Sequence, residues 1–218
     1  MPRPIDPDTW VPPSALPSAS AESIRGTRYG SRLYAQPEHA AFAERVRAFS
    51  APTDTALNLE IGVDRGYRLL AHARRWPHQR WLGVELRRTV LPAADAAPAN
   101  ALLLRGDARA VLSALVPVHG LQRVDILFPT PSDNPRHLLL TPAFITLLAS
   151  RLVRGGVLLF ATDIPGMARL AEALLADWAR VPEPPSGPVR SRREKVCAAQ
   201  DRPVWRWACV PPSLPGGV

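Results

Sequence analysis

Short apolar runs alternate with helix-like segments through most of this 218-residue chain, and no other feature restricts its fold as much. The runs have the length and the bulky apolar content of buried strands. They cover residues 55–63, 80–86, 101–108, 123–129 and 154–163. Strands that alternate with helices predict a parallel, doubly wound α/β sheet, in which ligands bind beyond the carboxyl ends of the strands.

The segments between these runs carry apolar residues at helical spacing. The predicted helices cover residues 37–49, 67–76, 109–116, 142–153 and 165–179, and a further helix at 89–99 is broken by Pro92. A Pro-rich hinge at 181–189 precedes a predicted pair of strands at 193–198 and 203–210. We expect the C-terminal strand to run antiparallel in an otherwise mostly parallel sheet.

Composition changes at both ends of this pattern. Residues 1–23 are rich in Pro, Ser and Ala, so we expect a disordered or loosely packed segment there, one domain at 24–210 and a flexible tail at 211–218. No apolar run has membrane-spanning length, and the N-terminus lacks a signal-peptide core, which predicts a cytoplasmic protein. Cys197 and Cys209 lack the spacing of metal ligands, so we expect buried thiols and no metal.

The net charge of +8 would attract phosphate groups and could steer a nucleic acid. However, Lys195 is the only lysine among the 27 basic residues. A compositional bias toward Arg explains the charge equally well, so the charge alone does not indicate a partner.

A strand-to-helix turn with glycines at 62 and 66 follows the first predicted strand. Gly62 allows a tight turn and a close ligand, and the N-terminus of the following helix favours a negative group. Sites for S-adenosylmethionine use this geometry for the carboxylate of the methyl donor, and Glu60 would face the donor's ammonium or structure the turn. Taken alone, the turn also fits an ordinary α/β connection.

Two further carboxylates end the next two predicted strands. Glu85 is placed to accept both ribose hydroxyls of a nucleotide, and Asp107 to contact an adenine amino group. Either residue alone could cap a helix or lie in a solvated turn. Acids at the ends of three successive strands, without the tight Gly-x-Gly-x-x-Gly of dinucleotide folds, favour a methyltransferase over a dehydrogenase.

The fourth strand leads into the Pro-rich loop LFPTPSDNPRH at 127–137. Together with LEIG…G, LGVE, N…L..DA, F…L…L..GG…ATD and a terminal E………V strand, the pattern FP.P….RH resembles the tRNA (guanine-N7-)-methyltransferases from about residue 57 to 208. The resemblance implies a Rossmann-like class I fold, S-adenosylmethionine as donor, and methylation of a guanine in the tRNA variable loop. It also implies donor binding by Glu60, Gly62, Glu85 and Asp107, and a substrate contact by Asp163.

The chain departs from the family at several of these positions. The family's FPDPWPK aligns with residues 128–134, so the Asp used for catalysis and donor contact is Thr130 here, and the substrate-contacting Lys is Asn134. The nearby Asp133 could supply the missing carboxylate or cap a turn. Asp64 stands at the middle glycine of the first turn. The family's substrate motif TKFE aligns with the substrate-binding candidates Ser191, Arg192, Arg193 and Glu194.

Several other side chains are candidates for RNA contacts. The basic ones are Arg28, Arg32, Arg136, Arg190, Arg192 and Arg193. We expect His137 to form hydrogen bonds within the loop rather than to catalyse. Trp205 and Trp207 lie on a predicted terminal strand, where packing is the simpler expectation.

The sequence thus favours a divergent methyltransferase that transfers a methyl group to N7 of a guanine in tRNA and acts as a monomer. A catalytically impaired homologue that binds tRNA or another partner is the first alternative. The second is a methyltransferase for a small molecule, suggested by the apolar run at 138–140, where the family has basic residues.

Overall fold

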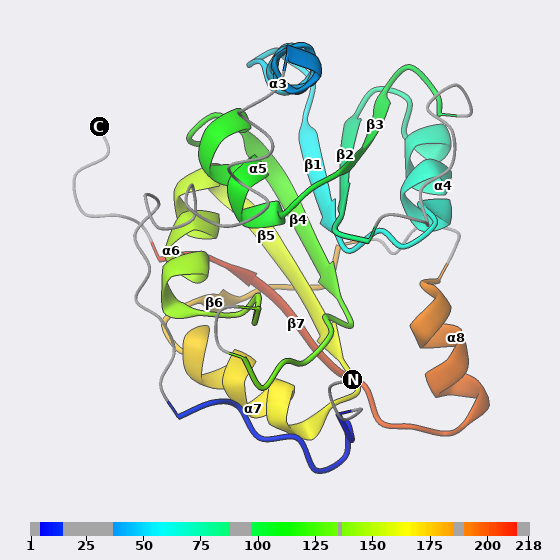
Figure 1. The fold of residues 1–218 in the computed structure, drawn as a ribbon, viewed down its shortest axis with the longest axis vertical. Coiled ribbons are helices and arrows are strands. Elements are labelled where there is room, and N and C mark those ends of the chain that lie inside the picture. Colours follow the sequence, from blue (N-terminus) through cyan, green and yellow to red (C-terminus); the bar gives the residue numbers. More distant parts are fainter. Residues whose placement is uncertain (1–4, 15–36, 88–96, 135–136, 185–189, 213–218) are drawn as a thin grey trace.

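A seven-stranded sheet in the order β3-β2-β1-β4-β5-β7-β6 forms the centre of the molecule (Figure 1). The computed structural model describes residues 5–14, 37–87, 97–134, 137–184 and 190–212. Strands β1 to β5 are parallel, and β7 pairs antiparallel with both β5 and β6. The predicted mostly parallel, doubly wound sheet with an antiparallel C-terminal strand is therefore confirmed.

Most elements lie close to the predicted ranges, but the helix expected at 165–179 ends at Leu174 and the short strand β6 was not predicted. The strands are β1 (Leu57–Ile61), β2 (Arg80–Glu85), β3 (Ala101–Arg105), β4 (Leu121–Leu127), β5 (Leu152–Thr162), β6 (Ala179–Arg180) and β7 (Trp205–Val210). The helices are α3 (Pro37–Ser50), α4 (Tyr67–Arg75), α5 (Ala108–Leu115), α6 (Pro142–Arg151), α7 (Pro165–Leu174) and α8 (Arg192–Ala199). The helix expected at 89–99 falls largely on residues outside the described part of the chain.

The two faces of the sheet differ in chemistry. One face packs against α5, α6 and α7 in a large apolar core that includes Leu57, Leu59 and Ile61 from β1 (Figure 1). The other face packs against α4, with α8 on the same side of the sheet, and its apolar cluster is smaller. There β1 and β4 also bury the charged residues Glu60, Arg123 and Asp125. Buried charges require partners, and these lie at the site described below.

The prediction of a strand at 193–198 is wrong, because these residues belong to helix α8. The Ser191 side chain accepts a hydrogen bond from the Glu194 amide, and the Glu194 side chain accepts one from the Ser191 amide. This reciprocal capping box is a sequence signature of a helix start. It stabilises α8 although the helix buries only Cys197.

Residues 5–14 pack against α7. They belong to the segment 1–23, for which the composition predicted disorder or loose packing. Trp10 is 4% exposed and belongs to the main apolar core. Gly166, in the first turn of α7, allows this contact, since a methyl group placed there would lie 2.1 Å from the Trp10 carbonyl oxygen. The segment is also joined to the loop before β7 by an ion pair of 2.6 Å between Asp8 and Arg202.

None of the helices in the described part of the chain combines the length and the apolar character needed to cross a bilayer. Both cysteines are buried free thiols. Trp207 is buried beside Phe160 and donates a hydrogen bond of 2.7 Å to Glu172, in line with the expected packing role.

Replacing Gly166 with Ala tests the contact between residues 5–14 and α7. The added methyl group would collide with the Trp10 backbone, so we expect the segment to detach and expose the Trp10 ring. The free energy of unfolding in urea should fall by about 2–3 kcal/mol, most of the cost of losing a buried aromatic side chain. Chymotrypsin should also cleave faster after Trp10.

Trp10→Ala provides the matched control. In that background the segment has already lost its anchor, so Gly166→Ala should no longer destabilise the protein. Without the contact, Ala would instead stabilise α7 by up to about 1 kcal/mol. A stability gain in the Gly166→Ala single variant would therefore contradict the described packing.

Candidate functional site

The connections that follow the parallel strands meet at one edge of the sheet. Hydrogen bonds join them: the Gly62 amide donates to the Val84 carbonyl at 2.8 Å, and the Gly106 amide donates to the Glu85 carbonyl at 2.9 Å. Between the ends of β4 and β5, the Phe128 amide donates to the Ala161 carbonyl at 2.7 Å. Parallel topology requires this convergence.

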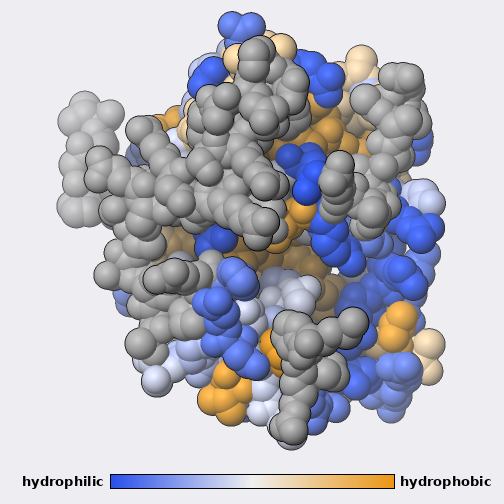
Figure 2. All heavy atoms as spheres, in the orientation of Figure 1, coloured by the Kyte–Doolittle hydropathy of each residue, from blue (hydrophilic) through white to orange (hydrophobic). Residues whose placement is uncertain are grey.

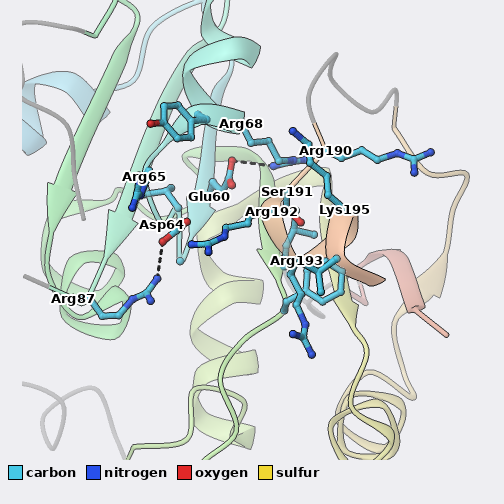
Figure 3. A pocket seen from close by; sticks show the side chains of 16 residues that line it. Glu60, Asp64, Arg65, Arg68, Arg87, Arg190, Ser191, Arg192, Arg193 and Lys195 are labelled. Atoms are coloured by element: carbon cyan, nitrogen blue, oxygen red, sulfur yellow. Dashed lines mark hydrogen bonds and ion pairs between the residues drawn. The ribbon is translucent and has the colours of Figure 1, made fainter. Parts of the chain in front are cut away.

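A cavity of about 690 Å³ opens at this edge (Figure 3). One wall is the turn after β1 with the start of α4, and the opposite wall is the start of α8. Leu127 and Phe128, at the end of β4, also line it. Of the residues predicted from sequence, the cavity brings together Glu60, Gly62, Arg190, Ser191, Arg192 and Arg193. Its volume is in the range of small-molecule and cofactor sites.

The turn after β1 uses backbone conformations that glycine adopts most easily. Gly62 has a φ of 78°, and no atom lies within 4 Å of the position that a Cβ would occupy. Asp64, which stands where the related pattern has glycine, has a φ of 51° in the left-handed region. Its carboxylate pairs with Arg87 at 2.9 Å. The turn therefore keeps its shape and gains a charged pair at the cavity's rim.

Glu60 lies at the base of the cavity in a buried ion-pair cluster. Arg68 from α4 pairs with Glu60 at 2.9 Å and with Asp125 of β4 at 2.7 Å. Arg123 makes two further contacts to Asp125, of 2.6 and 3.0 Å. All four residues are at most 8% exposed.

The two carboxyl groups of this cluster have pKa values shifted in opposite directions. Burial raises the pKa of Glu60 to about 7, and the nearby Arg68 only partly offsets this effect. Burial also opposes the ionisation of Asp125, but Arg68 and Arg123 together outweigh it and lower its pKa. Asp125 is therefore ionised at neutral pH, whereas Glu60 titrates there.

Glu85 and Asp107 stand beside the cavity rather than in its lining. Glu85 accepts hydrogen bonds from the amides of Asp64 and Arg87, at 3.0 and 2.9 Å. Asp107 caps α5 and forms an ion pair of 2.6 Å with Arg109. Asp107 thus has the helix-capping role that the simpler sequence interpretation gave it, whereas Glu85 is buried and binds backbone amides. Both lie at the carboxyl edge of the sheet.

Four cations line the cavity at the start of α8: Arg190, Arg192, Arg193 and Lys195. Figure 3 shows Arg192 reaching across the cavity toward the wall that carries Asp64, while Arg193 turns away from it. The capping box between Ser191 and Glu194 holds the start of this helix. Glu194 also pairs with Arg206 of β7.

Asp163 lies outside the cavity lining and is 3% exposed. It accepts a hydrogen bond of 3.0 Å from the Arg193 Nε and lies 3.3 Å from the Arg202 Nε. Burial opposes its ionisation, but the hydrogen bond and the charge of Arg193 outweigh this effect and lower its pKa. The pair ties α8 to the end of β5.

The loop after β4 places its substituted residues in solvent. Thr130, Asp133 and Asn134 are exposed, and none of them lines the cavity. Phe128 has a φ of 54°, an unusual conformation for an aromatic residue, and it turns the chain sharply at the cavity. Leu138 and Leu140 are buried in the main core, which explains the apolar run at 138–140 by packing.

Sequence reasoning missed several cavity residues, above all Arg68, Arg87, Tyr67 and Lys195. One signal could have indicated Arg68, since Asp125 is a charged residue within a buried strand and needs a cationic partner. Of the candidate RNA contacts, Arg28, Arg32 and Arg136 lie outside the described residues. In the part of the chain that the structure describes, no group of three His, Cys, Asp or Glu side chains is arranged to hold a metal ion.

Solved structures with the same fold include methyltransferases. The aminoglycoside resistance methyltransferase NpmB1 aligns with a TM-score of 0.54 and 16% identity, over 78% of this chain and 93% of its own. The 16S rRNA methyltransferase KamB aligns with a TM-score of 0.51 and 19% identity, over 79% and 94%. At these identities the likeness concerns the fold alone. A family described as "Putative methyltransferase" matches residues 54–183. The fold and the site therefore define a Rossmann-like, S-adenosylmethionine-dependent methyltransferase of class I.

Sequence relatives identify the family. A tRNA (guanine-N(7)-)-methyltransferase of Mycobacterium bovis is 34% identical over 189 residues, 75% of this chain and 71% of that protein. One of Anaeromyxobacter dehalogenans is 34% identical over 71% of this chain and 85% of its own. One of Azorhizobium caulinodans is 35% identical over 56% of each chain. This chain belongs to the tRNA (guanine-N(7)-)-methyltransferase family.

The raised pKa of Glu60 predicts how stability depends on pH. Its pKa rises from 4.5 to about 7 on folding, so between these values the folded state binds more protons than the unfolded state. The stabilisation is complete below about pH 4.5 and is lost as the pH rises through about 7. Relative to Glu60→Gln, the free energy of unfolding of the unmodified protein should fall by about 3 kcal/mol across this range.

Urea unfolding of both proteins at a series of pH values measures this difference. Glu44→Gln, on the exposed surface of α3, is the matched control. The difference between its free energy of unfolding and that of the unmodified protein should stay constant with pH. A constant difference between the unmodified protein and Glu60→Gln would show that the Glu60 carboxyl has the same proton affinity in both states.

Proposed function

We propose that this protein transfers a methyl group from S-adenosylmethionine to N7 of a guanine in tRNA. One observation carries the proposal: a single cavity at the carboxyl edge of the sheet has a donor-type turn on one wall and a row of cations on the other. The family relationship supports the same reading, since the relatives named above are tRNA (guanine-N(7)-)-methyltransferases.

The residues around the first turn fit the methyl donor. The space beside Gly62 is open, so a ligand can approach the backbone there. Glu60 would bind the ammonium group, and Glu85 and Asp107 would receive the ribose hydroxyls and the adenine amino group. Glu85 accepts its present hydrogen bonds from backbone amides and from Arg87, and a carboxylate has about four acceptor positions. Bound there, S-adenosylmethionine supplies a methyl group on a positively charged sulfur.

The wall formed by α8 fits the phosphates of a tRNA. Arg190, Arg192 and Lys195 are exposed cations at the cavity. Such side chains bind phosphates without reading the sequence. Tyr67, which is 66% exposed and lines the same cavity, offers an aromatic surface on which a base could stack. Ser191, Glu194 and the Asp163–Arg193 pair would act indirectly, because they hold α8 in place. A tRNA substrate would also place the protein in the cytoplasm.

The reaction does not require acid–base catalysis by the protein. N7 of guanine carries a lone pair, so no proton has to be removed before methyl transfer. Alignment of the reacting atoms in a closed site is then the main contribution. Thr130 provides a hydroxyl group but no negative charge to stabilise the purine as it becomes positive. Asn134 likewise replaces a cation with a neutral amide, which weakens the hold on phosphate.

A second candidate function is tRNA binding without turnover. The exposed, uncharged Thr130 and the engagement of Asp163 by Arg193 and Arg202 favour it. The small-molecule alternative loses its motivating feature, because Leu138 and Leu140 belong to the core.

Methyl transfer to tRNA that lacks N7-methylguanosine tests the proposal directly. We expect label from S-adenosylmethionine to appear as N7-methylguanosine, detected by mass spectrometry of the digested tRNA. Arg192→Gln should raise the KM for tRNA about tenfold and lower the salt dependence by about one charge, because it removes one phosphate contact. Arg169→Gln, on the exposed surface of α7, is the matched control and should leave both unchanged.

The outcomes separate the two candidates. tRNA binding without methylated product would support the non-catalytic homologue, whereas absence of both binding and transfer would contradict both.

Thr130→Asp restores the carboxylate that the resemblance implies at this position. We expect the rate of methyl transfer to tRNA to rise about a hundredfold, the lower end of the effect of one preorganised polar group near the reacting atoms. Thr130→Asn, which changes the shape of the side chain but adds no charge, should give no increase. A neutral or harmful effect of Thr130→Asp would mean that this loop no longer approaches the reacting guanine.

A further inference from the structure

The buried cluster at the base of the cavity forms a continuous chain of ion pairs. Its order is Arg123, Asp125, Arg68, Glu60, with closest contacts of 2.6, 2.7 and 2.9 Å between successive members. Arg68 and Glu60 line the cavity, whereas Asp125 and Arg123 do not. Glu60 and Asp125 are register partners on the adjacent strands β1 and β4, so their carboxylates lie on the same face of the sheet.

Arg68 divides its guanidinium between two carboxylates that compete for it. Asp125 receives a second guanidinium from Arg123, while among the described residues Glu60 pairs only with Arg68. The negative charge of Asp125 also repels a negative charge on Glu60, and Arg123 attracts one from farther away. The two residues therefore shift the pKa of Glu60 in opposite directions: Asp125 raises this pKa and Arg123 lowers it.

We propose that Asp125 and Arg123 are positioning residues for the methyl donor. Through Arg68 they set the charge of Glu60, and this charge sets how strongly Glu60 binds the ammonium group of the donor. This inference rests on the proposed donor site. Protonated Glu60 is neutral and attracts an ammonium group weakly. Ionised Glu60 forms a charge-assisted hydrogen bond with it. Donor affinity therefore rises with pH as Glu60 loses its proton.

The other charged groups around the cavity would not give the same pH dependence of donor affinity. They are Asp64, Arg65 and Arg87 on one wall, and Arg190, Arg192, Arg193 and Lys195 on the other. Arginine and lysine side chains keep their charge at neutral pH, and α-amino groups lose theirs only above about pH 7.5. His72 lies one helical turn after Arg68 on α4 and is buried. Burial together with the charge of Arg68 lowers its pKa to about 3, so it stays neutral.

Calorimetric titration with S-adenosylhomocysteine tests the inference, since this compound keeps the amino-acid end of the donor and is chemically stable. In the unmodified protein the affinity should be about eightfold weaker near pH 6 than near pH 7.5, the ratio for one proton with a pKa of about 7. Glu60→Gln should bind weakly with an affinity that does not change over this range.

Two variants away from the cavity should move the pH dependence in opposite directions. Asp125→Asn removes a repelling charge and leaves Arg68 to Glu60, so the midpoint should move to lower pH by about one pH unit. Arg123→Gln removes an attracting charge, so the midpoint should move to higher pH. The double variant Arg123→Gln/Asp125→Asn loses one charge of each sign, and its midpoint should lie between the two. Arg123→Lys keeps the charge and should restore the midpoint toward that of the unmodified protein.

Circular dichroism and thermal melting establish which variants fold. If Asp125→Asn does not fold, the comparison of Arg123→Gln with the double variant still decides the direction. Shifts in the same direction, or no shift, would overturn the inference while leaving donor binding intact. No binding of S-adenosylhomocysteine by the unmodified protein at any pH would instead overturn the proposed donor site together with the inference.

Discussion

The Arg68 guanidinium joins helix α4 to the two central strands of the sheet. It pairs with Glu60 on β1 and with Asp125 on β4, and those two carboxylates are register partners buried on one face. Without a cation between them, two acids would face each other away from water, which is strongly unfavourable. The placement of α4 and the shape of the turn before it depend on this contact. The first wall of the cavity therefore depends on it as well.

The second wall depends on contacts that α8 makes at its own start. This helix buries little apolar surface, so packing alone would leave it marginal. The reciprocal bonds between Ser191 and Glu194 satisfy its first amides, and the pairs Arg193–Asp163 and Glu194–Arg206 join it to the sheet. The residues that hold the wall differ from those that face the cavity, such as Arg192 and Lys195. A helix whose position depends on ion pairs is sensitive to salt and to the phosphates it would meet.

Much of the proposed donor side could be predicted from sequence. Parallel topology brings the ends of successive strands together, so Glu60, Glu85 and Asp107 had to gather at one edge. The ion-pair partners of Glu85 and Asp107 could not be predicted in this way. Arg87 and Arg109 reach these carboxylates only in particular side-chain conformations, which topology does not fix. The strand predicted at 193–198 was a local error. The pattern Ser191-x-x-Glu194 was a visible signal of a helix start, and it outweighs the apolar spacing of so short a segment.

The sequence by itself determined the alternation of the five parallel strands with their helices, the edge of the sheet at which acidic strand-end residues gather, and the family to which the chain belongs. These follow from apolar periodicity and from residues at strand ends, which are local properties. The tertiary structure alone decided which charges meet. Arg68 and Asp125 lie 57 positions apart, and only the packing of α4 on the sheet brings them within 2.7 Å. Burial then gives Glu60 a pKa of about 7, a property that no stretch of sequence contains because it depends on how much water folding removes.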